Sequence, residues 1–575
     1  MTSAGGPTPA SSGPSASSEP PATHKSSDHS PDGSPDGSPD ESRDASPDGS
    51  PDGSPDEWRD ASPEGSSGGS PQGSSREPAR LLGDAGPGAA GSAVANGRSL
   101  GPTAPRHGLP PLRPVQRAGP GWAVVVVLVV IGLSAGFVLK APCLDTYATP
   151  AGPSIDWREG RQYVHLCYSD TIPLYGLERL SEGDFPYKTS WTDEDGVTAR
   201  YMEYPVLTGL LQYVVMRGTK AWVALTDDTG PPDPPEVVVY FVLMALVLAL
   251  AWLVAVLATV PLLGRRRWGV VLIALSPLVI VHVFTNFDAL AVALCAGGML
   301  AWTRRRPTLA GLLLGLGAAA KLYPLFILGP LLLLGLRTGK LGSWGRAAAA
   351  AVGAWLAVNA PIALLYPQGW REFFRLNSTR PADHDTVYFA FRVLFGWQGF
   401  DGPLPANTAP VILNRVSLLL FAVICLAVAV IAWTAPVRPR VASLSFLVVA
   451  GFLLTNKVWS PQYSLWLVPL AVLAVARWKP ILLWMGVDAA VWYPRMQYFL
   501  TFDDRTTKIF VTGVLIRDVL VLALCAIVVR DIYRPAKDPV RRSGDDDPCG
   551  GIYENTPDDP PAWLPLPRRA PSPAT

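Results

Sequence analysis

The stretch WAVVVVLVVIGLSAGFVLK, from Trp122 to Lys140, sets the class of this protein. It carries no charged residue before Lys140, and its length is close to the roughly 20 apolar residues that a helix needs to cross a bilayer. Similar apolar runs recur along the chain to about residue 530. Because a span must satisfy its backbone hydrogen bonds internally, these runs predict helices. The sequence therefore predicts an all-α polytopic membrane protein.

We expect a bundle of about twelve transmembrane helices on the basis of these runs. After the first, the candidate spans are Val237–Leu263, Trp268–Phe284, Phe287–Trp302, Thr308–Ala320, Leu322–Leu336, Ala347–Leu365, Val416–Trp433, Val441–Leu454, Tyr463–Ala476, Ile481–Tyr493 and Ile509–Val529. The stretch Tyr204–Leu225 is less apolar, and we interpret it as an amphipathic or interfacial helix within a loop.

The two ends of the chain differ sharply from this apolar middle. The stretch SPDGSPDGSPDESRDA at residues 30–45 is repeated almost unchanged at residues 46–61. Such segments cannot bury enough apolar surface to offset their chain entropy. We therefore expect disordered cytoplasmic tails at residues 1–118 and 533–575, and one transmembrane catalytic domain at residues 119–532.

The positions of Lys and Arg orient the predicted spans, because these residues accumulate in short cytoplasmic loops. The basic clusters are Arg106/Arg113/Arg117, Arg265–Arg267, Arg304–Arg306, Arg337/Lys340/Arg346, Arg438/Arg440, Arg477/Lys479 and Arg530/Arg534. With the spans above, all of them fall on the same side as both termini. We predict a multi-pass protein of the plasma membrane with cytoplasmic termini and two long external loops, residues 141–236 and 366–415.

The external side gathers acids, bases and aromatic residues, which predicts an extracytoplasmic active site. The sequence has no Walker A loop or dinucleotide fingerprint. A transferase working outside the cytoplasm would take its sugar from a lipid carrier, whose phosphate is the leaving group. The reaction needs a carboxylate to accept a proton and cations to hold the phosphate. We expect no cofactor, no metal requirement and no nucleic-acid partner.

Four stretches resemble a known family: CYSDTIPLYGLERLSEGDFPY with EYPVLTGLL, FTNFDALAVAL, AAAKLYPLFILGPLLLL and NKVWSPQYSLWLVPL. Their order and sidedness are similar to those of the actinobacterial family 87 glycosyltransferases, which have the GT-C fold. The resemblance implies a mannosyltransferase that uses polyprenyl-phosphate-mannose and inverts the anomeric centre. It also implies an acidic base in the first external loop, a role that falls on Asp170 of YSD.

Asp170 also fits a structural role. It could cap a helix that begins at Thr171, where Pro173 suits an early position, and a cap could still act as a base. Three further carboxylates nearby are rival candidates for the base, although their spacing is more typical of a solvated helix face: Glu178, Glu182 and Asp184.

Other residues of the external side are candidates for binding the substrates. For the donor phosphate or the substrates, they are Lys457, Lys321, Arg380, His384 and Asp288; for lining the site, they are Tyr168, Tyr175, Glu203, Trp459 and Gln462. Each has a simpler alternative: the two lysines could snorkel to the membrane interface, Asp288 could cap a helix, and His384 could be a surface residue.

The sequence thus predicts a membrane glycosyltransferase that moves a hexose, mannose or conceivably arabinose, to a hydroxyl of an extracytoplasmic glycolipid or glycan. The alternative is a polytopic transporter or flippase of envelope lipids or solutes, which would be expected to show two repeated halves. A non-catalytic scaffold is a third interpretation. Cys143 and Cys167 of the first external loop could be bonded to each other or free.

Overall fold

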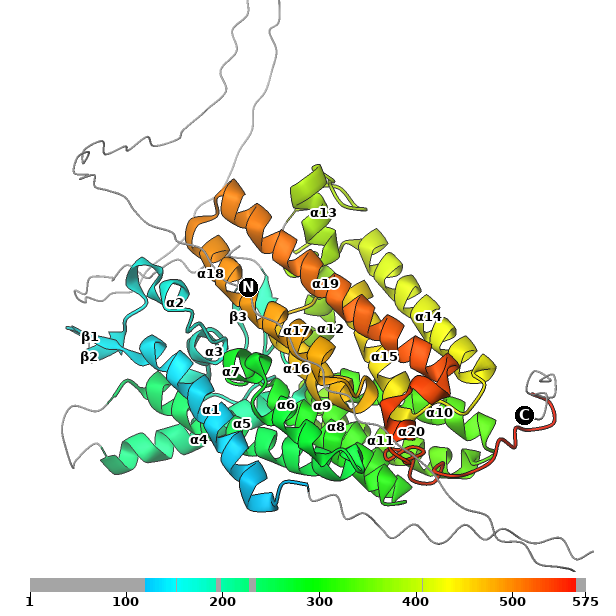
Figure 1. Ribbon diagram of the computed structural model, residues 1–575. Coiled ribbons are helices and arrows are strands. Elements are labelled where there is room, and N and C mark those ends of the chain that lie inside the picture. Colours follow the sequence, from blue (N-terminus) through cyan, green and yellow to red (C-terminus); the bar gives the residue numbers. More distant parts are fainter. Residues whose placement is uncertain (1–118, 151, 193–197, 227–233, 406, 565–575) are drawn as a thin grey trace, which may run out of the picture. The chain divides into compact units, whose positions relative to one another are not determined.

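The structure is a computed structural model that describes residues 119–150, 152–192, 198–226, 234–405 and 407–564 (Figure 1). These residues are mainly helical, and their strands form two short antiparallel hairpins. Thr146–Thr149 (β1) pairs with Gly152–Ile155 (β2), and Trp191–Thr192 (β3) pairs with Ala199–Arg200 (β4). The all-α class is confirmed. The predicted tail at residues 1–118, with its repeats, lies outside the described residues.

The apolar runs form helices where the sequence predicts them. They are α1 (Trp122–Lys140), α5 (Glu236–Thr259), α6 (Val270–Ala274), α7 (Pro277–His282), α8 (Asp288–Thr303), α9 (Pro307–Ala320), α10 (Leu328–Arg337), α11 (Leu341–Leu365), α14 (Val411–Thr434), α15 (Val441–Thr455), α16 (Ser464–Ala474), α17 (Trp478–Ala490) and α19 (Asp504–Tyr533). The other helices are α2 (Arg161–Val164), α3 (Thr171–Leu177), α4 (Val206–Thr226), α12 (Pro367–Thr379), α13 (Val387–Phe395), α18 (Trp492–Thr501) and α20 (Pro539–Arg542). The predicted span Trp268–Phe284 is broken into α6 and α7 at Ser276-Pro277, because proline cannot continue a helix from the preceding turn.

Helix length alone does not set the number of membrane spans. Among the described residues, five helices are long and apolar enough to cross a bilayer: Trp122–Leu144, Glu236–Leu263, Leu341–Leu365, Val411–Thr434 and Asp504–Tyr533. Six shorter apolar helices add to them: Arg267–His282, Asp288–Thr303, Pro307–Ala320, Tyr323–Arg337, Val441–Thr455 and Pro461–Ala474. The total of about twelve spans stays a prediction.

Several of the long helices expose apolar side chains on the outside of the bundle. Val138 of α1 is 69% exposed, and Leu418 of α14 is 70% exposed. Apolar surface left in water costs about 25 cal/mol per Å², and soluble monomers rarely keep large contiguous apolar patches. These outward faces fit contact with lipid tails, as expected for an integral membrane protein.

The centre of the bundle contains helices that are buried on every side. All residues of α16 are buried, and so are most residues of α15 and α8. Next to them, α9 packs closely on α11: a Cβ atom at Gly311 or Gly315 would collide with the backbone of Ala347 or Ala351. The absence of side chains at these two glycines lets the two helices approach closely. These buried helices form the core between the two ends of the bundle.

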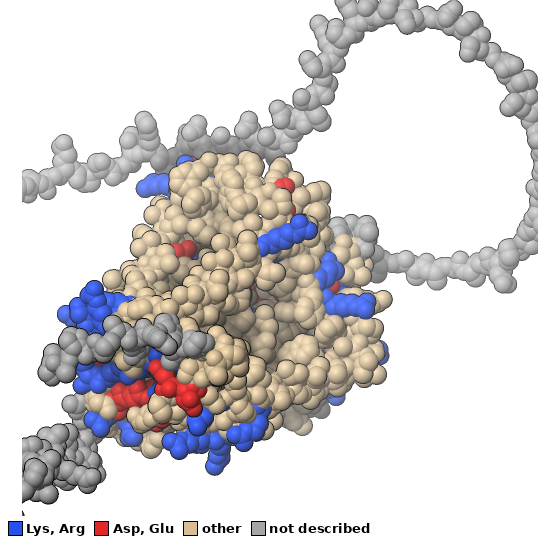
Figure 2. All heavy atoms as spheres, turned by 90° about the vertical axis from the view of Figure 1, so that its right-hand side faces the viewer, with Lys and Arg blue, Asp and Glu red and all other residues tan. Residues whose placement is uncertain are grey.

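One end of the bundle carries the basic clusters, and we call it the arginine end. Arg265, Arg337, Arg438 and Arg440 all lie there, because each of them contacts the same C-terminal segment. Figure 2 shows Lys and Arg side chains gathered with Asp and Glu at the lower left of one face, while uncharged residues make up most of the rest of the described surface in that view. The common cytoplasmic side of all the clusters stays a prediction, and the cluster Arg106/Arg113/Arg117 lies outside the described residues.

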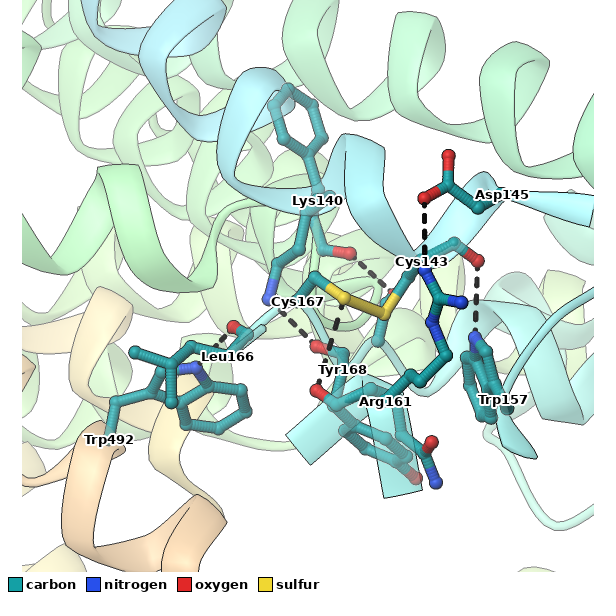
Figure 3. The surroundings of a disulfide bond; sticks show 12 residues. Lys140, Cys143, Asp145, Trp157, Arg161, Leu166, Cys167, Tyr168 and Trp492 are labelled. Atoms are coloured by element: carbon teal, nitrogen blue, oxygen red, sulfur yellow. Dashed lines mark hydrogen bonds and ion pairs between the residues drawn. A yellow bond between two sulfur atoms is a disulfide. The ribbon is translucent and has the colours of Figure 1, made fainter. Parts of the chain in front are cut away.

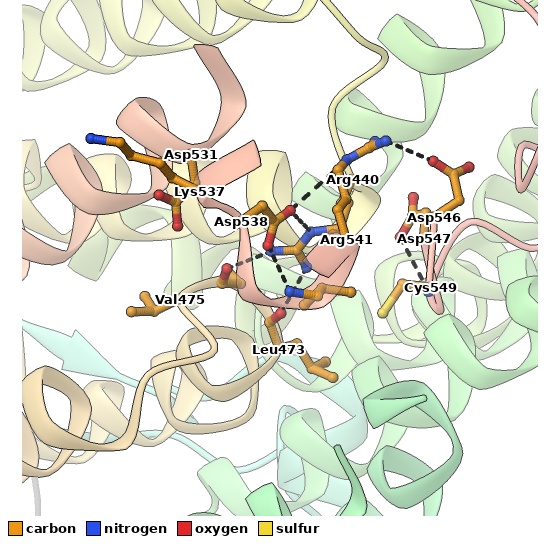
Figure 4. A network of polar contacts seen from close by, with 12 residues as sticks. Arg440, Leu473, Val475, Asp531, Lys537, Asp538, Arg541, Asp546, Asp547 and Cys549 are labelled. Carbon is orange, nitrogen blue, oxygen red and sulfur yellow. Dashed lines mark hydrogen bonds and ion pairs between the residues drawn. The ribbon is translucent and has the colours of Figure 1, made fainter. Parts of the chain in front are cut away.

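The C-terminal segment corrects one prediction. Residues 533–575 were expected to be disordered, but residues 535–564, here called the C-terminal strap, fold against the arginine end. Arg440 binds Asp538 at 2.8 Å and also donates to the carbonyl oxygens of Leu473 and Ala474 (Figure 4). Asp547 accepts from the backbone N–H of Val441 at the start of α15. The composition suggested disorder because the partners of these aspartates lie far away in the sequence.

Further strap contacts reach helices across the whole arginine end. Arg337 at the end of α10 makes a two-pronged ion pair with Asp558, at 2.7 and 2.8 Å. Trp302 of α8 donates to the carbonyl oxygen of Gly550, and Tyr553 donates to that of Leu331. Both side chains are buried. The strap thus ties together helix ends that are separated by more than a hundred residues of sequence.

Candidate active site

Asp170 lies at the opposite end of the bundle, which we call the Asp170 end. It occupies the N-cap position of α3, but its side chain makes no capping hydrogen bond. The carboxylate Oδ2 instead accepts from Asn286 Nδ2 at 2.8 Å and from Gln462 Nε2 at 3.5 Å. The residue is 8% exposed. Within the described parts of the chain its carboxylate is bound by amides and makes no ion pair, so it keeps lone pairs for a proton.

A disulfide fixes the approach to Asp170. Cys143, just after α1, is bonded to Cys167, just before Asp170, with the two Cα atoms 5.6 Å apart (Figure 3). Lys140 lies beside this bond and donates to the backbone oxygen of Tyr168 at 2.7 Å (Figure 3). The sequence left the state of these two cysteines open, and the structure resolves it as bonded.

The turn between α7 and α8 holds Asp170 from the other side. The backbone N–H of Asp170 donates to the Thr285 carbonyl oxygen at 2.8 Å, and the Ser169 hydroxyl donates to that of Phe284 at 2.7 Å. Asn286 of the same turn donates to Asp170 and to the Tyr204 hydroxyl, both at 2.8 Å. Sequence reasoning missed Asn286 as a site residue, although it stands inside the FTNFD stretch that supported the family resemblance.

Lys321 and Asp288 form an adjacent charged pair. The Lys321 ammonium lies 3.4 Å from Asp288 Oδ2, above the ring of Tyr463 at 4.7 Å. Trp466 of α16 donates to Asp288 Oδ1 at 2.7 Å. Asp170 and Lys321 also interact electrostatically. These contacts place a cation and several aromatic rings near the candidate base, and they show that Asp288 does more than begin α8.

A second polar group involves the long loop between α11 and α14. Lys457 donates to the carbonyl oxygens of Arg380 at 2.6 Å and Ser378 at 3.4 Å. Arg380 lies 3.4 Å from Asp383 Oδ2. Burial, reinforced by the nearby Arg380, lowers the pKa of Lys457 to about 8. Burial opposes the ionisation of Asp383, but Arg380, His384 and Arg495 together outweigh it and hold the pKa of that carboxyl below its usual range.

The other predicted site residues are spread around these two groups. His384 packs edge-on against Phe389 beside Asp383, with ring centroids 4.7 Å apart. Trp459 is buried, and the Arg517 guanidinium carbon lies 3.8 Å from the centroid of its indole ring. Of the residues expected to line the site, Gln462 contacts Asp170 directly. Trp459 instead packs against Arg517.

Three more of the predicted lining residues lie in the first long loop. Burial and the nearby Asp170 carboxylate raise the pKa of Tyr168 well above its usual value. Tyr175 instead stacks on Tyr240 of α5, with ring centroids 4.5 Å apart. Glu203 makes an ion pair with Arg200 at 3.5 Å. Tyr168 is thus the member of this set that lies next to the candidate base.

The rival carboxylates separate into two kinds. Glu182 is paired with Arg179 at 2.7 Å on the surface, and Asp184 is exposed, as a solvated face predicts. Glu178 differs from this prediction, because it is buried within the loop. Burial and the neighbouring Glu203 raise its pKa well above the usual value. Burial therefore disfavours the ionised form of Glu178, which is the form that a general base requires.

The geometry brings one carboxylate, two amides and several cations to the same end of the bundle. Lys140, Lys321 and Arg495 all interact electrostatically with Asp170. Such a site can accept a proton at Asp170 while nearby cations stabilise a negative charge that develops on a substrate. Such an arrangement could serve group transfer to a hydroxyl.

Comparison with known proteins supports this interpretation. The sequence model of glycosyltransferase family 87 matches residues 234–461, which confirms the predicted resemblance over that part of the chain. Together with the helical architecture, this match supports the predicted GT-C-like fold class and the prediction of a membrane glycosyltransferase. No curated protein matches the chain significantly.

Among solved structures, the apo crystal structure of ArnT from Cupriavidus metallidurans is similar over 72% of this chain and 78% of that chain, with 15% identity and a TM-score of 0.36. A similarity of that size is too low to transfer a mechanism.

Proposed function

We propose that this membrane glycosyltransferase transfers mannose from polyprenyl-phosphate-mannose to a hydroxyl of an extracytoplasmic glycolipid or glycan, with inversion. The observation that carries the proposal is the state of Asp170. Its carboxylate neither caps α3 nor pairs with a cation in the described chain, and amide donors orient it. A buried carboxylate arranged in this way suits a general base.

The reaction needs few protein groups. The acceptor oxygen forms a bond to the anomeric carbon while the bond from that carbon to the phosphate oxygen breaks. The polyprenyl phosphate leaves with the electron pair, and Asp170 takes the proton of the hydroxyl. Lys321, Lys457 or Arg380 would stabilise the negative charge on the phosphate. Attack from the face opposite the leaving group inverts the configuration.

Two features support an extracytoplasmic position for Asp170. The basic clusters lie at the arginine end, and Lys and Arg mark the cytoplasmic side of membrane proteins. The bond between Cys143 and Cys167 lies at the Asp170 end, and disulfides persist in oxidising compartments. In this orientation both chain termini are cytoplasmic. The donor then has to be a lipid-linked sugar, because nucleotide sugars are not found there.

The test is transfer of radiolabelled mannose from polyprenyl-phosphate-mannose into membrane glycolipid by the full chain in membranes. Asp170→Asn should lower the rate by about 10²- to 10⁴-fold, because it removes the general base and keeps the shape of the side chain. Glu182→Gln is the matched control, since it changes an exposed carboxylate of the same loop. Full transfer by Asp170→Asn would rule out the mechanism, and product analysis by mass spectrometry would test the sugar.

A further inference from the structure

Asn286 is buried between the candidate base and Tyr204, 3% exposed, in the turn that leads into α8. Its Oδ1 accepts the backbone N–H of Phe287 at 2.7 Å. The other half of the amide, Nδ2, must therefore point away from that N–H. It donates to Asp170 Oδ2 and to the Tyr204 hydroxyl, each at 2.8 Å. The amide is thus locked in one orientation by three contacts.

The two amide contacts of Asp170 converge on one oxygen. Asn286 at 2.8 Å and Gln462 at 3.5 Å both approach Oδ2. Oδ1 is then the oxygen that no amide occupies. A carboxylate held through Oδ2 by two amides has a defined rotamer, so its other oxygen has a defined direction, which is what proximity and orientation require of a base.

The same turn also fixes the backbone of the base. Thr285, next to Asn286, accepts the N–H of Asp170 at 2.8 Å. Two neighbouring residues of one turn therefore hold the main chain and the side chain of Asp170 together. Since Asp288 follows two residues later and faces Lys321, this turn sets the separation between the candidate base and the nearest charged pair.

We propose that Asn286 is a positioning residue that fixes the carboxylate of Asp170 through Oδ2 and directs Oδ1 toward the acceptor hydroxyl. This proposal rests on the proposed role of Asp170. Asn286 acts through Asp170 and touches no reacting atom, so its loss should affect the chemical step and leave donor binding intact. A charge-assisted hydrogen bond of this kind corresponds to about a 10- to 100-fold effect on kcat.

The experiment measures mannose transfer from polyprenyl-phosphate-mannose by the full chain in membranes, with the donor concentration varied. Asn286→Ala should lower kcat by about 10- to 100-fold with KM for the donor unchanged. In an Asp170→Asn background the same change should have no further effect, because the group it positions is already lost. Asn377→Ala is the control, since Asn377 is an exposed asparagine of α12 that donates within its own helix.

A pH profile distinguishes positioning from a loss of packing. The charged and titratable groups that interact with Asp170 are Lys140 of α1, Tyr168 before α3, Tyr204 before α4, Asp288 of α8, Lys321 after α9 and Arg495 of α18. All of them are unchanged in the variants. Removing a donor to the ionised carboxylate should move the acidic limb of the rate profile to higher pH in Asn286→Ala. Asn286→Asp keeps the size of the side chain and should move the acidic limb to still higher pH.

The possible outcomes separate the two proposals. Independent, multiplicative losses for Asn286→Ala and Asp170→Asn would overturn the positioning role while the base stands. A loss carried by KM, or an acidic limb that does not move in either Asn286 variant, would also overturn it. Full activity of Asp170→Asn would instead remove the base, and the positioning role with it. If Asn286→Ala fails to accumulate in membranes, Asn286→Asp carries the same test.

Discussion

Helix α8 runs between the two ends of the bundle. Its first residue, Asp288, lies at the Asp170 end, and its last turn contacts the C-terminal strap at the arginine end. The helix has 16 residues, so about 24 Å separates two very different polar regions. At the arginine end the buried Arg337, Arg438 and Arg440 are each paired with an aspartate of the strap. Arg440, for example, uses Asp538 and two carbonyl oxygens. At the Asp170 end Arg495 is also tightly paired, with Asp385 at 2.8 Å, but the groups next to Asp170 are paired more loosely.

Several groups at the Asp170 end keep unused capacity. Lys321 is 3.4 Å from Asp288, and Gln462 Oε1 is buried without a hydrogen-bond partner in the described chain. Lys457 donates to backbone carbonyls in place of a carboxylate. Buried polar groups are normally satisfied, and exceptions gather where function requires them. This contrast fits a stabilising role for the arginine end and the substrate-binding role proposed above for the Asp170 end.

The largest expected effect comes from a variant that should change activity without changing stability. Asp170→Asn should lower transfer by about 10²- to 10⁴-fold. The midpoint of thermal unfolding in detergent should stay within a few degrees of the parent value, because Asn still accepts from Asn286. Thermal unfolding and transfer are measured on the same preparation. A large drop in the midpoint would show that Asp170 is structural and would contradict the assignment of stability to the arginine end alone.

Asp538→Asn should give the reverse result at the arginine end. It leaves the buried Arg440 guanidinium without its carboxylate, and breaking such a pair costs about 3 kcal/mol. The thermal midpoint should fall, while the rate per folded molecule stays near that of the parent. Asp559→Asn, an exposed strap aspartate, is the control. An unchanged midpoint for Asp538→Asn would mean that the strap contributes little to stability.

The disulfide is expected to link stability to activity at the Asp170 end. Replacing Cys143 and Cys167 by Ser should lower the free energy of unfolding by about 3 kcal/mol, because the closed loop of the unfolded chain is released. Transfer should fall as well, since Asp170 follows closely in the chain. Cys425→Ser, an exposed free thiol of α14, is the control. Equal activity with and without the bond would show that other contacts suffice to hold Asp170.

The smallest expected effect is a pH dependence from Lys457. Burial and the nearby Arg380 lower its pKa to about 8, and Asp401 partly opposes this shift. The amine is charged below that pH and neutral above it, so its attraction for a donor phosphate is lost as the pH rises through about 8. We expect transfer to fall severalfold between pH 7 and 9. Lys457→Arg keeps its charge in this range and should remove the fall; a fall of the same size in the variant would exclude Lys457 as its cause.

Local patterns in the sequence were sufficient to predict much of this architecture. The first predicted span, Trp122–Lys140, coincides with α1, and α15 and α19 contain the spans predicted for them. Apolar runs determine helices in this way because each helix satisfies its backbone within the run. Asp170 was predicted on a different basis, because the resemblance of the stretch around YSD to family 87 glycosyltransferases implies an acidic base there, and its role stays a prediction.

The strap shows where local patterns fail. Its composition predicts disorder, because a segment rich in Pro, Asp and Arg has little to bury by itself. The partners that order it are the buried Arg440 and Arg337, about a hundred or more residues earlier in the chain. A short segment of sequence cannot show charge pairs between residues that are this far apart in the chain. The prediction for residues 535–564 was wrong for this reason.

The helices follow from local sequence, and the candidate base follows from the resemblance of one short stretch. What surrounds that base depends on the folded bundle. Asn286 lies 116 residues from Asp170 in the chain and Gln462 lies 292 residues from it, yet both amides meet one carboxylate oxygen. Helix formation follows from neighbours in the sequence, whereas the packing of α8, α16 and the first long loop brings these amides together. The orientation of Asp170 is therefore a property of the packed bundle.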